Sequence, residues 1–144
     1  MQPNNPKYPH PSSKAVTAVM KSNRRTNTKP EVTVRSELHR FGFRFKKDFV
    51  IKINGRRCRP YIVFTKNKLA IFIDGCFWHL CPQHGHIPKV NVDYWNSKLN
   101  GNKARDEADT IFLTNNGWHV LRLWEHLPSA VSASIIIITL GKLR

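Results

Sequence analysis

The stretch Ala70–His84, AIFIDGCFWHLCPQH, decides the fold of this chain. It continues an apolar run, Leu69 to Ile73, into a turn that carries an acid, two thiols, two imidazoles and two aromatic rings. A short and wholly apolar run is typical of a central strand. Because this strand ends in so many chemically active side chains, the sequence predicts a functional site at that edge of a sheet.

The segments around this strand predict an α/β domain. Thr28 and Glu31 match a capping box at the start of a helix that Gly42 ends, and Asn54-Gly55 is a hairpin signal. The expected elements are a helix over Thr28–Gly42, strands over Phe49–Ile53, Tyr61–Thr65 and Leu69–Ile73, one or two helices over Asn91–Asn116 capped by Gly117, a strand over Trp118–Glu125, and a helix, or alternatively a strand, over Ala130–Leu140. This order favours a mixed central sheet flanked by helices.

The length and composition suit one basic domain. The chain has 144 residues and a formal net charge of +15, so we expect a polyanion partner, with nucleic acid the first candidate. Residues 1–13 are read as a flexible tail rich in Pro, Asn and Ser, and residues 14–144 as the domain. No apolar run is long enough to span a membrane, so a cytoplasmic, nucleoid-associated location is expected.

The thiols and imidazoles of the turn indicate a metal site. Cys76, Cys81 and His84 have the close spacing of a structural zinc site, which needs a fourth ligand. His126, after the strand over Trp118–Glu125, is a candidate, and His79, His86 and Cys58 compete with it. The alternative is a pair of unligated cysteines with surface histidines.

Acids are scarce in this chain, so their positions are informative. Asp74 closes the central strand, Glu31 lies in the first turn of the first helix, and Asp106 lies in the middle helix. Carboxylates gathered at the end of a sheet can hold Mg²⁺ against a phosphodiester, and His79 would then exchange the proton. The alternative for each acid is a helix cap or a salt bridge, and for Glu31 this alternative is favoured.

Aromatic and basic side chains predict contacts with DNA. Phe77 and Trp78 stand between Cys76 and His79, where a metal-bound turn displays rings suited to stacking or wedging between base pairs. Packing in the core is the alternative. A short helix over Lys14–Arg25 would end in Arg24 and Arg25 and bring these cations to phosphates, or it would be solvated.

Three motifs resemble the very short patch repair endonucleases, which are DNA mismatch nicking enzymes of the restriction-endonuclease-like superfamily. They are DGCFWHLCPQH, the pair VDYW and NKARD, and the closing GWHVLRLWEH. The resemblance covers roughly Met20 to Leu127. It implies a nuclease that recognises a T:G mismatch in double-stranded DNA and nicks the strand 5′ to the mismatched thymine with Mg²⁺.

The resemblance also implies roles for single residues. Cys76, Cys81, His84 and His126 match structural zinc positions, and Phe77, Trp78 and Met20 match residues that wedge beside the mismatch. His79 matches a catalytic histidine, Asp106 a carboxylate that assists proton transfer, and Asp74 a position where the family carries Asp or His. We expect the protein to act as a monomer, with mismatch-repair proteins as partners.

The sequence departs from the family at Tyr61. The family places its central metal-binding Asp directly after a proline, and here Arg59-Pro60 is followed by Tyr61. A phenol with a reference pKa of about 10 is a poor ligand for Mg²⁺. Three interpretations remain: a degenerate enzyme that still binds DNA, an accidental change in the sequence, or a metal carried by Asp74 with a backbone carbonyl.

Two other functions compete with mismatch nicking. A non-catalytic DNA-binding module would bind the mismatch and leave both strands intact, and Tyr61 favours it. A nuclease of the same fold would instead act on another mismatch, a damaged base or plain duplex. A catalytic zinc ion is a further option that a site closed by four protein ligands disfavours.

Overall fold

The computed structural model describes residues 29–143 of the chain. The expected tail, the short helix over residues 14–25 with Met20, Arg24 and Arg25, and Thr28 of the capping box lie outside the described residues. In the part that is described, no helix is long and apolar enough to cross a membrane.

The centre of the fold is a three-stranded mixed sheet of β3 (Ile62–Phe64), β4 (Leu69–Asp74) and β5 (His119–Trp124). β4 lies in the middle, antiparallel to β3 and parallel to β5. Every residue of β4 is buried. This confirms the prediction of a mixed sheet built on the apolar run before Asp74, because a strand covered on both faces has no solvent-facing side chains.

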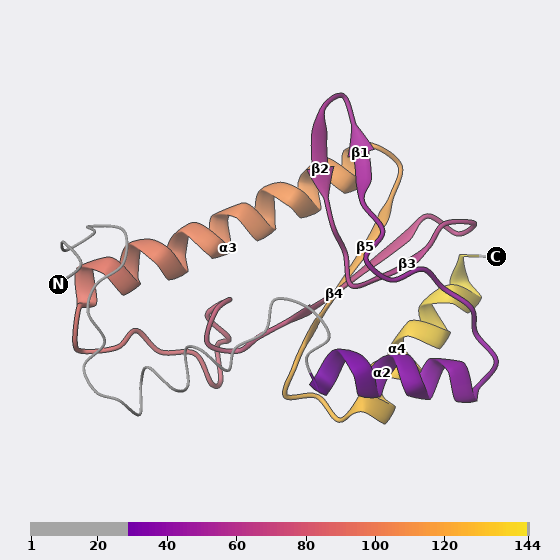
Figure 1. Cartoon of the computed structure of the whole chain (residues 1–144), viewed down its shortest axis with the longest axis horizontal. Helices are drawn as coiled ribbons and strands as arrows, with labels where there is room; N and C mark the ends of the chain where they lie inside the picture. Colours follow the sequence, from indigo (N-terminus) through magenta and orange to yellow (C-terminus); the bar gives the residue numbers. More distant parts are fainter. Residues whose placement is uncertain (1–28, 144) are drawn as a thin grey trace, which may run out of the picture.

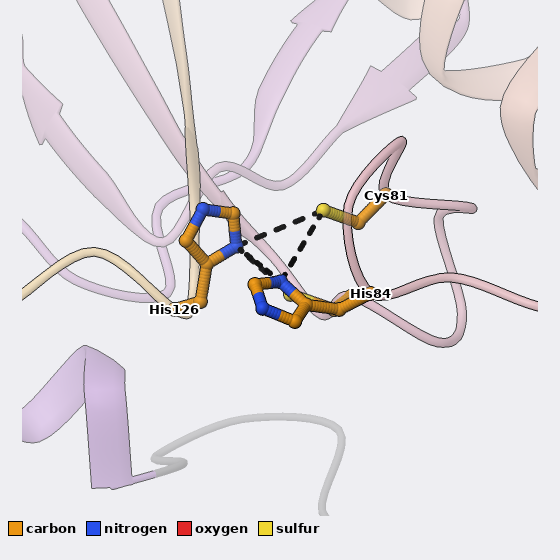
Figure 2. Close-up of side chains that lie close together, drawn as sticks. Cys81, His84 and His126 are labelled. Atoms are coloured by element: carbon orange, nitrogen blue, oxygen red, sulfur yellow. Dashed lines mark hydrogen bonds between the residues drawn. The ribbon is translucent and has the colours of Figure 1, made fainter.

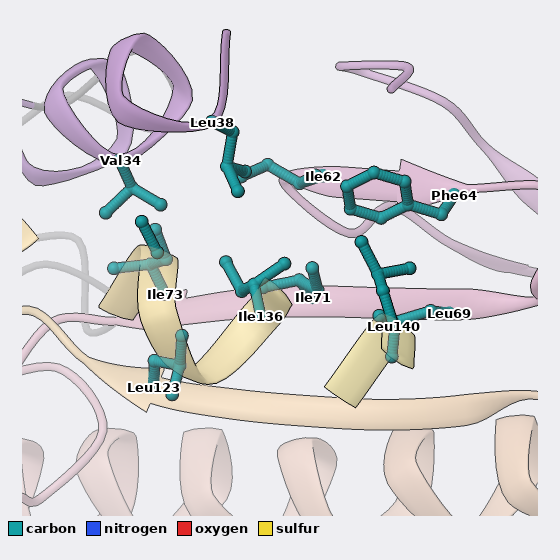
Figure 3. Close-up of a cluster of buried hydrophobic side chains, with 11 residues drawn as sticks. Val34, Leu38, Ile62, Phe64, Leu69, Ile71, Ile73, Leu123, Ile136 and Leu140 are labelled. Atoms are coloured by element: carbon teal, nitrogen blue, oxygen red, sulfur yellow. The ribbon is translucent and has the colours of Figure 1, made fainter. Parts of the chain in front are cut away.

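Helices α2 (Lys29–Arg40) and α4 (Ser129–Lys142) cover one face of this sheet (Figure 1). Their buried side chains point toward β3 and β4. Figure 3 shows Val34, Leu38, Ile136 and Leu140 facing side chains of these two strands, among them Ile62, Leu69, Ile71 and Ile73. The helix predicted for the isoleucine-rich segment is confirmed as α4, and the alternative of a strand was wrong. The interlocked aliphatic side chains fix α2 and α4 relative to the sheet.

Glycines end two of the helices as the sequence predicts. Gly42 follows α2 with a φ of +83° and donates its N–H to the carbonyl of His39, while Phe43 donates to Leu38. Gly117 follows α3 in the same way, also at +83°. This pattern satisfies carbonyls that the helix leaves unpaired, and only glycine adopts the left-handed conformation without strain.

The long helix α3 (Val92–Asn115) and a β-hairpin cover the other face. The hairpin consists of β1 (Ile51–Ile53) and β2 (Arg56–Cys58), which pair across the turn at Asn54-Gly55 and form a separate two-stranded sheet. In Figure 1 the hairpin projects beside the carboxyl end of α3. The sequence allowed one or two helices over residues 91–116, and the structure has the single helix α3 there.

One expected strand was too long, and one strand was missed. The strand over Phe49–Ile53 is limited to Ile51–Ile53, and the basic segment after the turn, to which no strand was assigned, forms β2. Arg56 and Arg57 are exposed in β2, so this strand has no buried alternation by which to recognise it. The hairpin signal was the only local indication of the pairing.

The alternation of β4 and β5 determines where the site lies. Leu69, Ile71 and Ile73 of β4 belong to the cluster on the α2 and α4 side, whereas Ala70 and Phe72 belong to the cluster on the α3 side. Asp74 continues this second set, because side chains two apart on a strand share a face. The functional turn therefore opens toward α3.

Candidate functional site

Asp74, His79 and Asp106 meet at the carboxyl end of β4. Their ligand-type atoms lie within 4.8 Å of one another. Asp106 of α3 binds Nδ1 of His79, and the nearest carboxylate oxygen of Asp74 lies 3.9 Å from the same nitrogen. The turn after β4 supplies the histidine, and packing of α3 on the sheet supplies Asp106, so two segments far apart in the sequence build the group.

Burial and charge set the protonation of this group. Burial lowers the pKa of His79, but its hydrogen bond with Asp106 and the negative charge of Asp74 outweigh burial, so the pKa is raised overall. Burial raises the pKa of Asp74 against the opposing effect of Arg122 and His79. A histidine held at Nδ1 by a carboxylate exchanges its proton through the other ring nitrogen, which is the arrangement of a general acid or base.

Arg122 of β5 completes the group, and sequence reasoning did not single it out as functional. Its Nη1 donates to both carboxylate oxygens of Asp74, at 3.0 and 3.2 Å, and its guanidinium lies 4.1 Å from the ring centroid of Phe72. Asp74 is thus paired with a fixed cation. A charged residue on the inward face of an otherwise apolar strand was the signal available in the sequence.

A pocket of about 170 Å³ opens beside this group. Its lining side chains include Arg59, Tyr61, Asp74, His79, Asp106 and Arg122. Burial, followed by the charges of Glu31, Asp74 and Asp106, raises the pKa of Tyr61 to about 12, so the phenol is neutral at physiological pH. The pocket therefore contains a protonated phenol where a carboxylate was expected.

Glu31 lies apart from the group at the end of β4. Its side chain is buried within α2, and it is close enough to Tyr61 for its charge to raise the pKa of the phenol. It is not among the ligand atoms that gather around His79. The structure thus brings Glu31 to Tyr61 and leaves it outside the group of Asp74, His79 and Asp106.

A second cluster brings together Cys76, Cys81, His84 and His126. Their ligand atoms all lie within 4.8 Å of one another. Nδ1 of His126 is 3.2 Å from the sulfur of Cys76, 3.7 Å from that of Cys81 and 3.2 Å from Nδ1 of His84. Figure 2 shows the side chains of Cys81, His84 and His126 pointing toward one another from two segments.

These separations have the dimensions of a tetrahedral zinc site. Bonds of about 2.3 Å to sulfur and 2.0–2.1 Å to nitrogen place neighbouring ligand atoms roughly 3.3–3.8 Å apart. Burial raises the pKa of Cys76 to about 11, and Cys81 adds to this effect. Two neighbouring thiols resist ionising together unless a cation lies between them, so this donor set suits a bound metal ion.

The turn that carries the cluster is held by its own backbone. The N–H of Cys81 donates to the carbonyl of Cys76 at 2.9 Å, and that of Gly85 donates to Cys81 at 2.7 Å. A Cβ at Gly85 would lie 2.6 Å from the carbonyl oxygen of Cys81. Only glycine permits this approach, which brings His84 back toward the thiols.

The other candidate ligands lie elsewhere. His79 is bound by Asp106, and the ring of His86 lies 5.8 Å from that of Phe77. Cys58 is buried in the hairpin, with its sulfur 3.6 Å from Asp109. Of the four candidates named for the fourth position, only His126 lies among the thiols of the turn.

Phe77 and Trp78 form an aromatic group with Trp95 of α3. The ring of Trp95 lies 5.4 Å from Phe77 and 5.8 Å from Trp78, and those two rings are 5.1 Å apart. Phe77 and Trp78 are half-buried, whereas Trp95 is 8% exposed. The two rings therefore neither enter the core fully nor project freely. Sequence reasoning missed the support that Trp95 gives them.

Comparisons with known proteins bear on the family of the chain. Residues 11–84 match the family model described as DNA mismatch endonuclease Vsr. Over 131 residues the chain is 48% identical to the type II nicking enzyme V.NaeI of Lentzea aerocolonigenes, covering 89% of this chain and 79% of that protein.

Two further relatives agree. The type II nicking enzyme V.XorIIP of Xanthomonas oryzae pv. oryzae is 38% identical, over 74% of this chain and 76% of its own length. The DNA mismatch endonuclease Vsr of Escherichia coli K12 is 36% identical over 72 residues, which are 46% of this chain and 44% of that protein. With the α/β fold and the grouped side chains after β4, these matches show that the chain belongs to the Vsr family of DNA endonucleases.

Proposed function

We propose that this protein binds double-stranded DNA at a T:G mismatch and nicks one strand beside the mismatched thymine. The observation that carries the proposal is the bond between His79 and Asp106, which lies beside Asp74 in a pocket at the sheet edge. A histidine oriented by a carboxylate exchanges protons with a water molecule or a DNA oxygen near neutral pH. The names of the relatives, which are nicking enzymes and a mismatch endonuclease, support the same reaction.

DNA recognition is assigned to two surfaces of the described residues. Phe77 and Trp78 lie four or fewer positions from His79 and Cys81, so a wedge formed by their rings would place the mismatch next to the pocket. Arg56, Arg57 and Arg59 are exposed on and beside β2, and Arg59 also lines the pocket. Cations at that position neutralise phosphates without reading sequence.

We assign a structural zinc ion to Cys76, Cys81, His84 and His126. Their separations and donor types fit tetrahedral coordination, with no position left for substrate. The ion would join the turn after β4 to the segment after β5. That link would hold Phe77, Trp78 and His79 in one orientation relative to the sheet.

The residues of the pocket do not complete a Mg²⁺ site. Magnesium takes oxygen ligands, and the resemblance implies that it is the ion of the reaction. Here both carboxylate oxygens of Asp74 accept hydrogen bonds from Arg122, and Tyr61 offers a neutral phenol. We therefore derive the proton transfer from His79 and Asp106 alone.

The second candidate function is a mismatch-binding protein of the same fold that is impaired in nicking. Tyr61 favours it, because a partly buried phenol with a pKa of about 12 cannot supply the negative charge that a carboxylate would. Phe77, Trp78 and the basic side chains of the hairpin do not depend on Tyr61 for their placement, so binding would persist.

The test compares the protein with its Tyr61→Asp and Tyr61→Phe variants. Each is loaded with zinc and incubated with Mg²⁺ and an end-labelled duplex that contains one T:G mismatch. A matched T:A duplex is the control, and Tyr61→Phe removes the hydroxyl while keeping the ring. Binding to both duplexes is measured in parallel by fluorescence anisotropy.

The outcomes separate the two candidates. Nicking of the T:G duplex by the unaltered protein supports the first candidate. Nicking by Tyr61→Asp alone, with selective binding by all three proteins, supports the second. Equal binding of T:G and T:A duplexes with no nicking by any of the three proteins overturns both.

A further inference from the structure

The guanidinium of Arg122 is bonded on several sides. Nη1 donates to both oxygens of Asp74, Nε donates to the hydroxyl of Thr110 at 2.9 Å, and Nη2 donates to the backbone carbonyl of Asp106 at 3.2 Å. Its plane also rests on Phe72. An arginine fixed at each of its nitrogens cannot turn away to bind a phosphate without losing these bonds.

The position of the Arg122 charge determines whether a divalent ion can bind beside His79. Nη1 also lies 3.8 Å from a carboxylate oxygen of Asp106, so one cation stands between the two acids that flank His79. A divalent ion held by the same two carboxylates would need that space. It would also meet the repulsion of a unit charge a few ångströms away.

We propose that the guanidinium of Arg122 occupies the space beside Asp74 that a divalent ion would take. In this place it positions the carboxylates of Asp74 and Asp106 about His79. Arg122 is thus a positioning residue, acting through the two carboxylates. Its hydrogen bonds hold the carboxylate of Asp74 in place, and its Nη2 holds the turn of α3 that carries Asp106. The misfit with Mg²⁺ then has two parts, a phenol at position 61 and a guanidinium at position 122.

This inference rests on the proposed function in taking the pocket as the cleavage centre, but its test needs neither DNA nor activity. The zinc-loaded full chain is titrated with Mn²⁺ as a stand-in for Mg²⁺, and free Mn²⁺ is measured by electron paramagnetic resonance. The unaltered protein is compared with Arg122→Met, Arg122→Gln and Arg122→Lys. Circular dichroism melting curves establish that each variant is folded.

We expect Arg122→Met and Arg122→Gln to bind Mn²⁺ roughly tenfold or more tightly than the unaltered protein, because a nearby positive charge has been removed. Arg122→Lys keeps the charge and should show no gain. Adding Asp74→Asn to Arg122→Gln should abolish the gain, whereas Asp93→Asn, at an exposed acid in the first turn of α3, should leave it intact.

Several results would overturn the proposal. One is an unaltered protein that binds Mn²⁺ as tightly as Arg122→Gln. Another is a gain that survives Asp74→Asn. If both neutral variants are unfolded, the unaltered protein is tested by following the nuclear magnetic resonance signal of the Arg122 Nε–H. Broadening of this signal by stoichiometric Mn²⁺ contradicts the proposal that Arg122 already fills the site. An unchanged signal supports it. Loss of nicking with these binding results intact would count against the proposed function alone.

Discussion

The sulfur of Cys76 lies 3.2 Å from Nδ1 of His126, although 50 positions separate the two residues in the chain. The contact follows from the parallel pairing of β4 with β5, which brings Asp74 opposite Trp124 and so places the segments after both strands side by side. Glu125 adds a second link, because its carboxylate accepts the N–H of Cys76 at 3.1 Å. The carboxyl ends of β4 and β5 lie side by side, so the candidate ligands that follow each strand lie close together.

Removal of zinc should loosen this junction. We expect Cys81→Ser to lose the bound ion and to lower the free energy of unfolding by about 4 kcal/mol when free zinc exceeds its dissociation constant a thousandfold. Zinc content by atomic absorption and melting curves with and without chelator measure the effect. Cys58→Ala is the control, since Cys58 lies in the hairpin core and should retain the full zinc content. Equal zinc loss in both variants would contradict the assigned ligand set.

A methyl group at Gly85 should disturb the same turn through its backbone. In Gly85→Ala the new Cβ would meet the carbonyl oxygen and the nitrogen of Cys81 at 2.6 and 2.7 Å, so the chain must shift. We expect a loss of about 1–3 kcal/mol in unfolding free energy and weaker zinc binding.

Gly101→Ala provides the matched control for Gly85→Ala. Gly101 lies within α3 with no atom near its added Cβ, so alanine should stabilise the protein by about 0.5–1 kcal/mol. Competition with a chromogenic zinc chelator reads out the affinity of both variants. Unchanged zinc affinity in Gly85→Ala would show that the turn tolerates the shift.

Trp95 should control how the half-buried rings of Phe77 and Trp78 engage DNA. In Trp95→Leu, Phe77 and Trp78 each lose one aromatic neighbour, so we expect the preference for a T:G over a T:A duplex to fall, with about 2–3 kcal/mol less stability. Trp95→Phe should restore most of the preference.

Trp118→Leu separates this effect from a general loss of stability. Trp118 packs in the cluster on the α3 side of the sheet, apart from the rings of the turn. This variant should be destabilised and yet keep the T:G preference in anisotropy measurements. A similar loss of preference in Trp95→Leu and Trp118→Leu would indicate that stability alone governs recognition.

Tyr61 should make the protein sensitive to alkaline pH. Burial raises the pKa of its phenol from 10.0 to about 12, so above pH 10 the unfolded chain ionises while the folded protein does not. Stability should therefore fall as the pH rises through this window, by about 2 kcal/mol after allowance for partial solvent exposure. Denaturant unfolding of the unaltered protein and of Tyr61→Phe measures the difference. Parallel pH profiles for the two proteins would contradict a buried phenol.

Apolar patterns explain which elements were predictable. The runs in β3 and β4 reflect burial that these central strands need wherever they pack, and Gly42 and Gly117 mark helix ends by conformation alone. β2 was missed because two of its three residues are exposed arginines and its pairing depends on the turn at Asn54-Gly55. A strand on a separate two-stranded sheet carries little of the burial pattern that reveals a central strand.

The candidate site also contains residues that the sequence identified and residues that it did not. The residues of the turn were visible because reactive side chains were crowded into one short segment. Asp106 was noted as one of few acids and His126 as a candidate fourth ligand, and the resemblance implied a role for each. Arg122 and Trp95 were not assigned roles in the site, since an arginine in a strand or a tryptophan in a helix can serve packing, a salt bridge or a binding site equally well. Their partners, Asp74 and the rings of Phe77 and Trp78, come from another segment.

The sequence by itself determined most of the helices and strands, β2 excepted, the basic character, the reactive turn after β4 and the family, because these depend on residue types and short-range spacing. The tertiary structure decided which charges face one another. Packing of α3 against β4 and β5 brought Arg122 to Asp74 and Asp106 to His79. Electrostatic effects depend on distance and burial, and these are properties of the folded chain.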